Sequence, residues 1–225
     1  MNVIKSVVAG VALLGSSVAF SAPIVWGGAQ NTAGALDVVV SGSLVEAFNA
    51  GSSNTGSVTV NSVTFTNTGA LLPQSTNTNP LNGSSSGDAS YNQLLGSFDF
   101  GGGTVTSLSI GGGNLQTGLD YIVQVWYTDL RSCCSGRIMT FGDGLGSNVN
   151  LNATGGGLGQ FAVGQFTADA ASQTLSLASN NFGNAHITAY QVRELESVSQ
   201  VPVPGPLLLI GLGLVLIGAR RSLRA

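Results

Sequence analysis

The stretch Leu119-Asp-Tyr-Ile-Val-Gln-Val-Trp-Tyr-Thr-Asp-Leu130 has the most regular apolar pattern in the chain. Successive side chains of a β-strand point to opposite faces of its sheet. Both alternating sets of this stretch are largely apolar, which is typical of a strand buried on both sides. We therefore predict the central strand of a packed sheet. One face carries Leu119, Tyr121, Val123, Val125 and Tyr127, and the other carries Ile122, Gln124, Trp126 and Thr128.

Short apolar runs separated by glycine and asparagine turns lie on either side of this strand. The sequence has no internal repeat of the kind that a β-propeller or β-helix needs. Between the two termini, no segment keeps a helical period over eleven residues. These patterns predict an all-β body that folds as a β-sandwich or jelly roll. The other predicted strands are Ala35–Val40, Ser43–Ala50, Val58–Phe65, Leu94–Phe100, Thr104–Ile110, Arg137–Phe141, Ser147–Leu151, Phe161–Ala168, Thr174–Ala178 and Ala185–Val192.

Two local features interrupt this series of strands. The alternation of Val58–Phe65 slips by one residue at Asn61-Ser62, which indicates a bulge or a tight turn. Asn67–Ser90 is rich in serine, threonine, asparagine and glycine and has few large apolar residues, so we predict a long surface loop.

The N-terminus has the pattern of a secretory signal peptide. Lys5 supplies the positive charge, Val7–Leu14 is the apolar segment, and Ser17-Val-Ala19 offers small residues for cleavage. We assign residues 1–22 to this signal, so the body of the protein is expected to leave the cytoplasm.

The C-terminus, residues 201–225, has the pattern of a membrane segment. Val201-Pro-Val-Pro-Gly-Pro206 precedes the uncharged run Leu207–Ala219, whose 13 residues would form a helix about 20 Å long against a hydrocarbon core of about 30 Å. The arginines that follow favour the cytoplasmic side. We predict a short transmembrane helix at 207–219 and an exported domain at 23–200. The basic end consists of Arg220, Arg221 and Arg224.

This order of proline motif, apolar helix and terminal arginines resembles the PEP-CTERM sorting signal of Gram-negative bacteria that make extracellular polysaccharide. The matching motif is Pro202, Val203, Pro204 and Gly205, with Val203 at the place of the family's glutamate. The resemblance implies a membrane-embedded exosortase as processing partner, transient residence in the inner membrane, and release to the cell surface.

The body also resembles uncharacterised exported bacterial β-domains. Tyr121–Arg131 and Thr188–Arg193 are among the blocks that carry this resemblance. It implies a jelly roll of the galactose-binding-like or laminin-G-like type, and it implies no activity.

The charge of the body excludes one class of partner. Residues 23–200 contain ten acidic residues, three arginines and no lysine, a net charge of −7. Nucleic-acid binding requires a cationic surface, so no nucleic acid is expected. The polarity comes instead from serine, threonine, asparagine and glycine, which suits a neutral, hydrogen-bonding exterior.

Cys133 and Cys134 are the two cysteines of the chain, and they are adjacent. A disulfide between neighbours closes a small strained ring, so an ordinary structural bridge is not expected. The alternatives are a vicinal disulfide, pairing between molecules, and two free thiols.

We find no catalytic constellation in the sequence. His186 is the only histidine, and no nucleophile elbow precedes a helix. Glu46 and Asp129 are carboxylates that a polysaccharide hydrolase would use, but neither has a recognisable setting. Asp129 and Arg131 lie two residues apart and favour an ion pair.

Two binding alternatives remain at the level of the sequence. In the first, Trp126 or Tyr127 stacks on a sugar ring while Asp129 and Arg131 hydrogen-bond its hydroxyl groups. In the second, Asp143-Gly144 with Asn148 and Asn150 supplies oxygen ligands for calcium, although the spacing matches no EF-hand and favours an ordinary glycine turn. We otherwise expect no cofactor.

Together these patterns predict a non-enzymatic exported protein of the cell surface or extracellular matrix with a structural or adhesive role. The alternative is a carbohydrate-binding module for extracellular polysaccharide, and a polysaccharide hydrolase is the third hypothesis.

Overall fold

The strand predicted to be central is β9 (Asp120–Tyr127), and it lies in the middle of the largest sheet. The computed structural model describes residues 23–51, 56–67, 70–76, 79–134, 136–180 and 183–196. The predicted signal peptide, sorting motif, transmembrane helix and basic end lie outside these residues. Among the described residues, no helix has the length and apolar character needed to cross a membrane.

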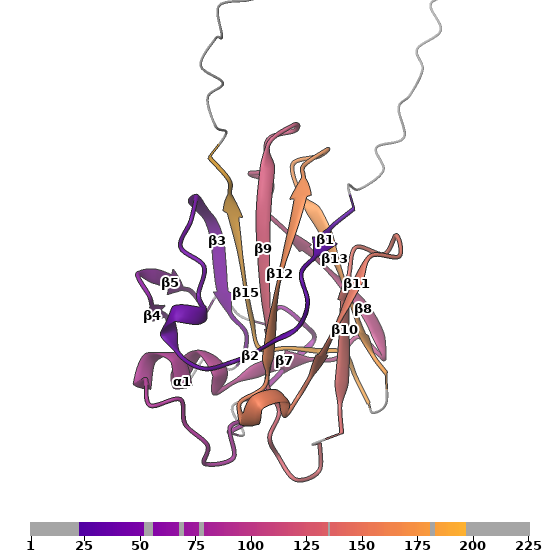
Figure 1. Ribbon diagram of the computed structural model, residues 1–225. Coiled ribbons are helices and arrows are strands. Elements are labelled where there is room, and N and C mark those ends of the chain that lie inside the picture. Colours follow the sequence, from indigo (N-terminus) through magenta and orange to yellow (C-terminus); the bar gives the residue numbers. More distant parts are fainter. Residues whose placement is uncertain are drawn as a thin grey trace, which may run out of the picture. The chain divides into compact units, whose positions relative to one another are not determined.

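The sheet around β9 has six antiparallel strands. Its order is β1-β12-β9-β15-β3, and β2 also pairs with β12. Figure 1 shows these strands side by side, with β3 and β1 at the edges. The partners of β9 are β1 (Val25–Trp26), β2 (Gln30–Asn31), β3 (Ser43–Asn49), β12 (Gln160–Thr167) and β15 (Ala189–Glu194).

A second antiparallel sheet, of four strands, packs against one face of the first. Its order is β11-β10-β13-β8. The main core contains Tyr121, Val123 and Val125 of β9 together with Phe141 and Leu177 of the second sheet. The strands of this sheet are β8 (Val105–Ile110), β10 (Ile138–Gly142), β11 (Asn148–Asn152) and β13 (Gln173–Ser179).

A smaller layer covers the opposite face of the six-stranded sheet, and Figure 1 shows it on the side away from the second sheet. Trp126 enters this second core, where Tyr91 and Phe65 contact it. Both faces of β9 are therefore buried, as predicted. The layer consists of the 3₁₀ helix η1 (Ala35–Asp37), the hairpin β4 (Val58–Val60)–β5 (Val63–Phe65), and α1 (Ala89–Leu95).

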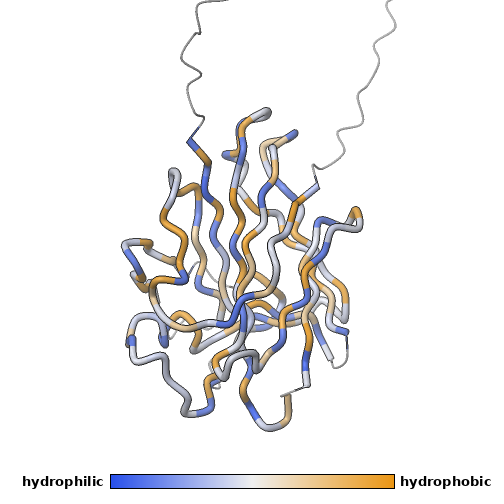
Figure 2. The backbone as a smooth tube through the Cα atoms, in the orientation of Figure 1, coloured by the Kyte–Doolittle hydropathy of each residue, from blue (hydrophilic) through white to orange (hydrophobic). Residues whose placement is uncertain are grey.

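The remaining elements lie near one end of the sheets. A small sheet of order β14-β7-β6 joins β6 (Gln74–Thr76), β7 (Phe98–Phe100) and β14 (His186–Ile187). A short 3₁₀ turn, η2 (Gly155–Gly157), precedes β12. Figure 2 shows hydrophobic and hydrophilic residues alternating along many of the strands, as half-buried sheets require.

The all-β class with antiparallel sheets is confirmed, and several element predictions need correction. Ala35–Val40 is not a strand but contains η1. Asn67–Ser90 is not one loop, because β6 lies within it and α1 begins in it. Leu94–Phe100 begins in α1 and becomes strand only at Phe98. The slip at Asn61-Ser62 is a tight turn in which both residues have positive φ, at 46° and 67°.

Candidate functional site

A cavity of about 340 Å³ lies at the end of β9 where the loop to β10 begins. This volume falls within the range of small-molecule sites. We call it the distal cavity, because the other end of β9 adjoins Leu195, whose N–H donates to the carbonyl of Asp120 at 2.8 Å. The distal cavity is lined by Phe98, Phe100, Arg131, Cys133, Cys134, Arg137, Gly183 and Asn184.

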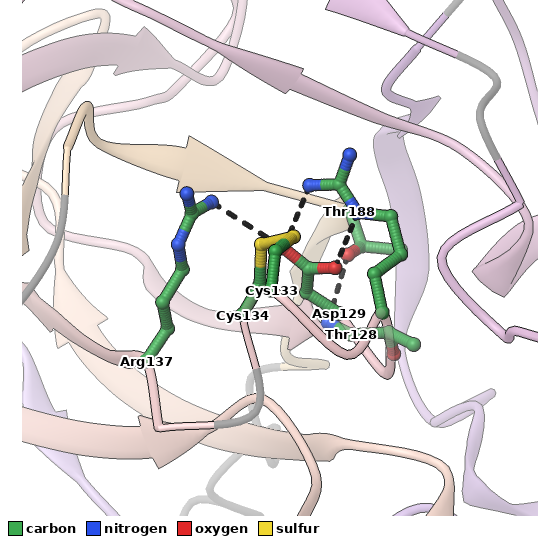
Figure 3. A network of polar contacts seen from close by, with 7 residues as sticks. Thr128, Asp129, Cys133, Cys134, Arg137 and Thr188 are labelled. Atoms are coloured by element: carbon green, nitrogen blue, oxygen red, sulfur yellow. Dashed lines mark hydrogen bonds and ion pairs between the residues drawn. A yellow bond between two sulfur atoms is a disulfide. The ribbon is translucent and has the colours of Figure 1, made fainter.

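Asp129 forms the polar centre beside this cavity. Its side chain is fully buried, and it accepts hydrogen bonds from Arg131 Nε at 2.7 Å and Arg131 Nη2 at 2.9 Å. Arg137 Nη1 donates to the same carboxylate at 3.3 Å, and Figure 3 shows this ion pair beside the cysteine pair. A buried carboxylate needs such charged partners to offset its desolvation. The predicted ion pair between Asp129 and Arg131 is thus confirmed, and Arg137 joins it.

The two arginines differ in how completely their donors are used. Arg131 makes a two-pronged contact with Asp129, and its guanidinium carbon lies 4.8 Å from the ring centre of Phe98. The hydrogen bond to Asp129 raises the pKa of Arg131. Arg137 reaches Asp129 through one nitrogen, and its Nε is buried without a hydrogen-bond partner among the described residues. Arg137 is therefore the arginine with unused donor capacity.

Positive charge on the body is concentrated at this cavity. Of the three arginines in residues 23–200, Arg131 and Arg137 line it with side chains 27% and 21% exposed. The third, Arg193, is buried, and its guanidinium donates to the carbonyl oxygens of Val40, Ser41 and Gly42. Arg193 therefore fixes the segment after η1, and the two remaining arginines make the distal cavity locally cationic in an acidic body.

A buried layer of aromatic and titratable side chains lies beneath the cavity. His186 is fully buried, stacks on Phe98 with ring centres 3.7 Å apart, and meets the edge of Tyr127 at 4.9 Å. Neither ring nitrogen of His186, nor the Tyr127 hydroxyl, has a hydrogen-bond partner in the described part of the chain. Burial lowers the pKa of His186 well below its ordinary value, and the charges of Arg137 and Arg131 lower it further.

Because its pKa is lowered on folding, buried His186 is expected to contribute to the pH dependence of the free energy of unfolding. Between the lowered pKa of folded His186 and about 6.5, the unfolded chain binds more protons, so stability rises with pH there. The contribution is lost as the pH falls below about 6.5, at up to about 1.4 kcal/mol per pH unit. Urea unfolding at pH 7.5, 6.5 and 5.5 measures this slope. Because His186 is the only histidine, H186Q should flatten it, and an unchanged slope in H186Q would contradict the assignment.

Cys133 and Cys134 form a disulfide with each other, which answers the question that the sequence left open. Cys133 is exposed and Cys134 is buried, and both line the distal cavity. The pair lies between Arg131 and Arg137 in the sequence, so it shapes the loop that presents both guanidinium groups. Its sulfur atoms add an apolar patch to a wall that is otherwise cationic and aromatic.

The predicted sugar-stacking role of Trp126 and Tyr127 is wrong. Both side chains are fully buried, because β9 has strands on both sides and a packed layer over each face. Asp129 is likewise buried and is engaged by the arginines. Of the four proposed glycan contacts, Arg131 alone lines the distal cavity.

The carboxylates considered for hydrolysis do not come together. Glu46 pairs in register with Val192, and Val192 with Val123, which is six residues before Asp129. Six residues of extended chain span about 20 Å, whereas paired catalytic carboxylates lie about 5–9.5 Å apart. Glu46 instead accepts a hydrogen bond from Gly111 N at 2.5 Å, and burial raises its pKa.

The residues considered for calcium have other partners. Asp143 accepts hydrogen bonds from Ile24 N at 3.0 Å and Leu145 N at 2.6 Å. Asn150 accepts one from the Thr140 hydroxyl at 2.6 Å. Within the described ranges, no three histidine, cysteine, aspartate or glutamate side chains gather as a metal site would require.

A second cavity, of about 430 Å³, lies at the other end of β9. It is larger, but among the described residues the one charged group in its lining is Asp120, and Pro23 and Leu195 border it. The distal cavity is the better candidate site because cationic, aromatic and disulfide groups converge there.

Sequence reasoning missed most of the distal cavity. The segment Arg131-Ser-Cys-Cys-Ser-Gly-Arg137 holds two of the three arginines of the body and was the available signal. Phe98, Phe100, Gly183 and Asn184 come from distant parts of the chain, and no local pattern links them to that segment.

The chain was compared with protein families, curated proteins and solved structures. No family model matches it, and no curated protein or solved structure shows significant similarity.

Proposed function

We propose that this protein is a non-enzymatic adhesive protein of the cell surface or extracellular matrix. In this proposal, residues 1–22 direct export, and residues 201–225 act as a PEP-CTERM-like sorting signal that an exosortase processes at the inner membrane. The body, with its two packed antiparallel sheets, is then a jelly roll of the galactose-binding-like or laminin-G-like type.

The placement of the distal cavity carries this proposal. Pro23 and Leu195, beyond which the predicted signal peptide and the predicted sorting tail lie, border the same cavity at one end of β9. The distal cavity lies at the other end, and the eight residues of β9 span about 26 Å. Figure 1 shows β1 starting and β15 ending at the same end of the body. A body held by its C-terminal tail until processing, or attached to the surface through its new C-terminus afterwards, would present the distal cavity at the end far from that attachment.

The exposed chemistry of the second sheet supports an adhesive role. Asn180 Nδ2 donates to the Thr140 hydroxyl at 2.9 Å, and that hydroxyl lies 2.6 Å from Asn150 Oδ1. Amide and hydroxyl groups thus form a neutral ladder on an exposed face, suited to hydrogen bonding with hydrated polymers.

Mass spectrometry of the cell-surface fraction tests the sorting proposal. We expect a mature chain that lacks the N-terminal signal and ends near Gly205, without Leu207–Ala219. A double variant P202A/P204A should remain in the inner membrane at full length, and the body variant Q165E should be processed normally. Extracellular protein that still ends at Ala225 would contradict sorting by cleavage.

Carbohydrate binding is the second candidate function, and the distal cavity favours it. Its aromatic, disulfide and guanidinium walls combine apolar surface with hydrogen-bond donors, as sugar sites require. A glycan array probed with and without a chelator tests this function and any need for calcium. Binding that is absent in both conditions would contradict it.

A further inference from the structure

We propose that the distal cavity binds the carboxylate of an acidic sugar residue, with Arg137 as the primary ligand-binding residue. This inference rests on the proposed role in binding extracellular polysaccharide and adds the chemical class of the ligand. The convergence of two arginines, an aromatic wall and the vicinal disulfide on one cavity carries it.

The charge of the site favours an anion. Arg131 and Arg137 contribute two positive charges against the one negative charge of Asp129, which leaves a local excess of one. The body as a whole is acidic, with a net charge of −7. At physiological ionic strength charges are screened over about 8 Å, so an anion in the cavity interacts mainly with the groups that line it.

The geometry of Arg137 favours a carboxylate. Its guanidinium makes one 3.3 Å contact with Asp129, whereas Arg131 makes two shorter contacts with the same carboxylate. A guanidinium has five N–H donors, and a planar carboxylate matches two of them at once. Because Arg137 Nε is buried, a ligand carboxylate would pair with the terminal nitrogens of Arg137, of which Nη2 makes no contact with Asp129.

The walls leave space for a sugar ring beside this guanidinium. Gly183 lies next to this guanidinium without a side chain of its own, and a Cβ atom added to it would lie 3.7 Å from Arg137 Nη2. Half-buried Phe100 and exposed Cys133 supply apolar surface for the C–H face of a pyranose, and exposed Asn184 supplies an amide for its hydroxyl groups. These contacts distinguish a sugar acid from a free inorganic anion.

Calorimetric titration of the full chain in detergent tests this inference with two matched probes. The probes are tetragalacturonate and its methyl ester, which have the same sugar chain but differ in charge. We expect the ester to bind about ten- to hundredfold more weakly, the usual effect of losing a hydrogen bond to a charged group. We expect R137Q to weaken tetragalacturonate binding by a similar factor, and R137K to weaken it less.

The control variant is Q165E, which changes the net charge as R137Q does but lies at the other cavity, where Gln165 is exposed. Its affinity for tetragalacturonate should match that of the unmodified chain. The comparison of tetragalacturonate with its methyl ester uses the unmodified chain. It therefore tests carboxylate recognition even if an Arg137 variant folds poorly.

Each alternative outcome has a distinct meaning. Equal binding of acid and ester would overturn carboxylate recognition while leaving glycan adhesion intact. Unchanged binding by folded R137Q would place the ligand elsewhere and overturn the inference. Tetragalacturonate that fails to bind would also overturn it, whereas neutral glycans on the array and the processing of the tail test the proposed function separately.

Discussion

Replacing Trp126 with alanine is expected to lower the free energy of unfolding by about 3–5 kcal/mol, the usual cost of truncating a buried large aromatic side chain. Trp126 is fully buried in the second core. Its Nε1 donates to the Tyr91 hydroxyl at 3.1 Å, and its ring meets the edge of Phe65 with centres 5.6 Å apart. The substitution would therefore leave a cavity between the central sheet and the layer formed by α1 and the β4–β5 hairpin.

Urea unfolding followed by circular dichroism measures this effect without relying on tryptophan fluorescence. L36A is the control, because Leu36 is 89% exposed and its truncation should change stability by less than about 0.5 kcal/mol. A midpoint for W126A equal to that of L36A would contradict the two-faced burial of β9.

Replacing Asp129 with asparagine is expected to cost a comparable amount, about 3–5 kcal/mol, because it removes one member of a buried ion-pair cluster. Asp129 is fully buried, while Arg131 and Arg137 are 27% and 21% exposed. Asparagine keeps the shape of the side chain but leaves two neighbouring guanidinium groups without their shared counter-charge.

A second substitution distinguishes two possible causes of the stability loss in D129N, which are repulsion between the arginines and loss of packing. The double variant D129N/R137Q removes one of the two unpaired cations, so it should recover part of the stability lost in D129N. D169N removes a carboxylate outside this cluster and should have little effect on urea unfolding. The electrostatic explanation is contradicted if D129N is as stable as D169N, or if the double variant loses the sum of both single effects.

The central strand could be predicted because its signal is local. Every second residue from Tyr121 to Tyr127 enters the main core, and Trp126 enters the other core, so an apolar pattern on both faces corresponds directly to two covered faces. The turn at Asn61-Ser62 was also a local signal, since both residues adopt the positive φ that tight hairpins need.

Ala35–Val40 does not form the predicted strand, because side chains, and not a neighbouring strand, make the hydrogen bonds to the backbone of this region. Asp37 accepts hydrogen bonds from the N–H groups of Ala33 and Gly34, which stabilises the 3₁₀ turn η1. Beyond the turn, Gln124 accepts a hydrogen bond from Val39 N at 3.0 Å, and Gln191 donates to Val39 O at 2.9 Å. Gln124 and Gln191 lie far from Val39 in the sequence, so no local sequence pattern predicts these hydrogen bonds.

Helix α1 was missed because its seven residues are too few to establish a helical period. Its signal was the cap, in which the Asp88 side chain accepts a hydrogen bond from Tyr91 N at 2.8 Å. Tyr91, Leu94 and Leu95 then bury one face of the helix.

The candidate site was predictable only where its residues are close in sequence. The pairing of Asp129 with Arg131 follows from their spacing in the sequence. Arg137 reaches the same carboxylate only because the loop between Arg131 and Arg137 folds back toward it. The error over Trp126 and Tyr127 has the same origin as the success with β9: a strand with two apolar faces has no face left for a ligand. His186 and Phe98 stack because β14 and β7 pair, an association between distant segments.

Hydrogen–deuterium exchange of the full chain, with and without tetragalacturonate, locates the ligand on the protein. We predict slower exchange in peptides that cover residues 131–137 and 183–187, and unchanged exchange around residues 23–26 and 165–167. Slower exchange at the cavity beside Pro23 and Gln165 instead, or no change in any peptide, would contradict an acidic-sugar site at the distal end of β9.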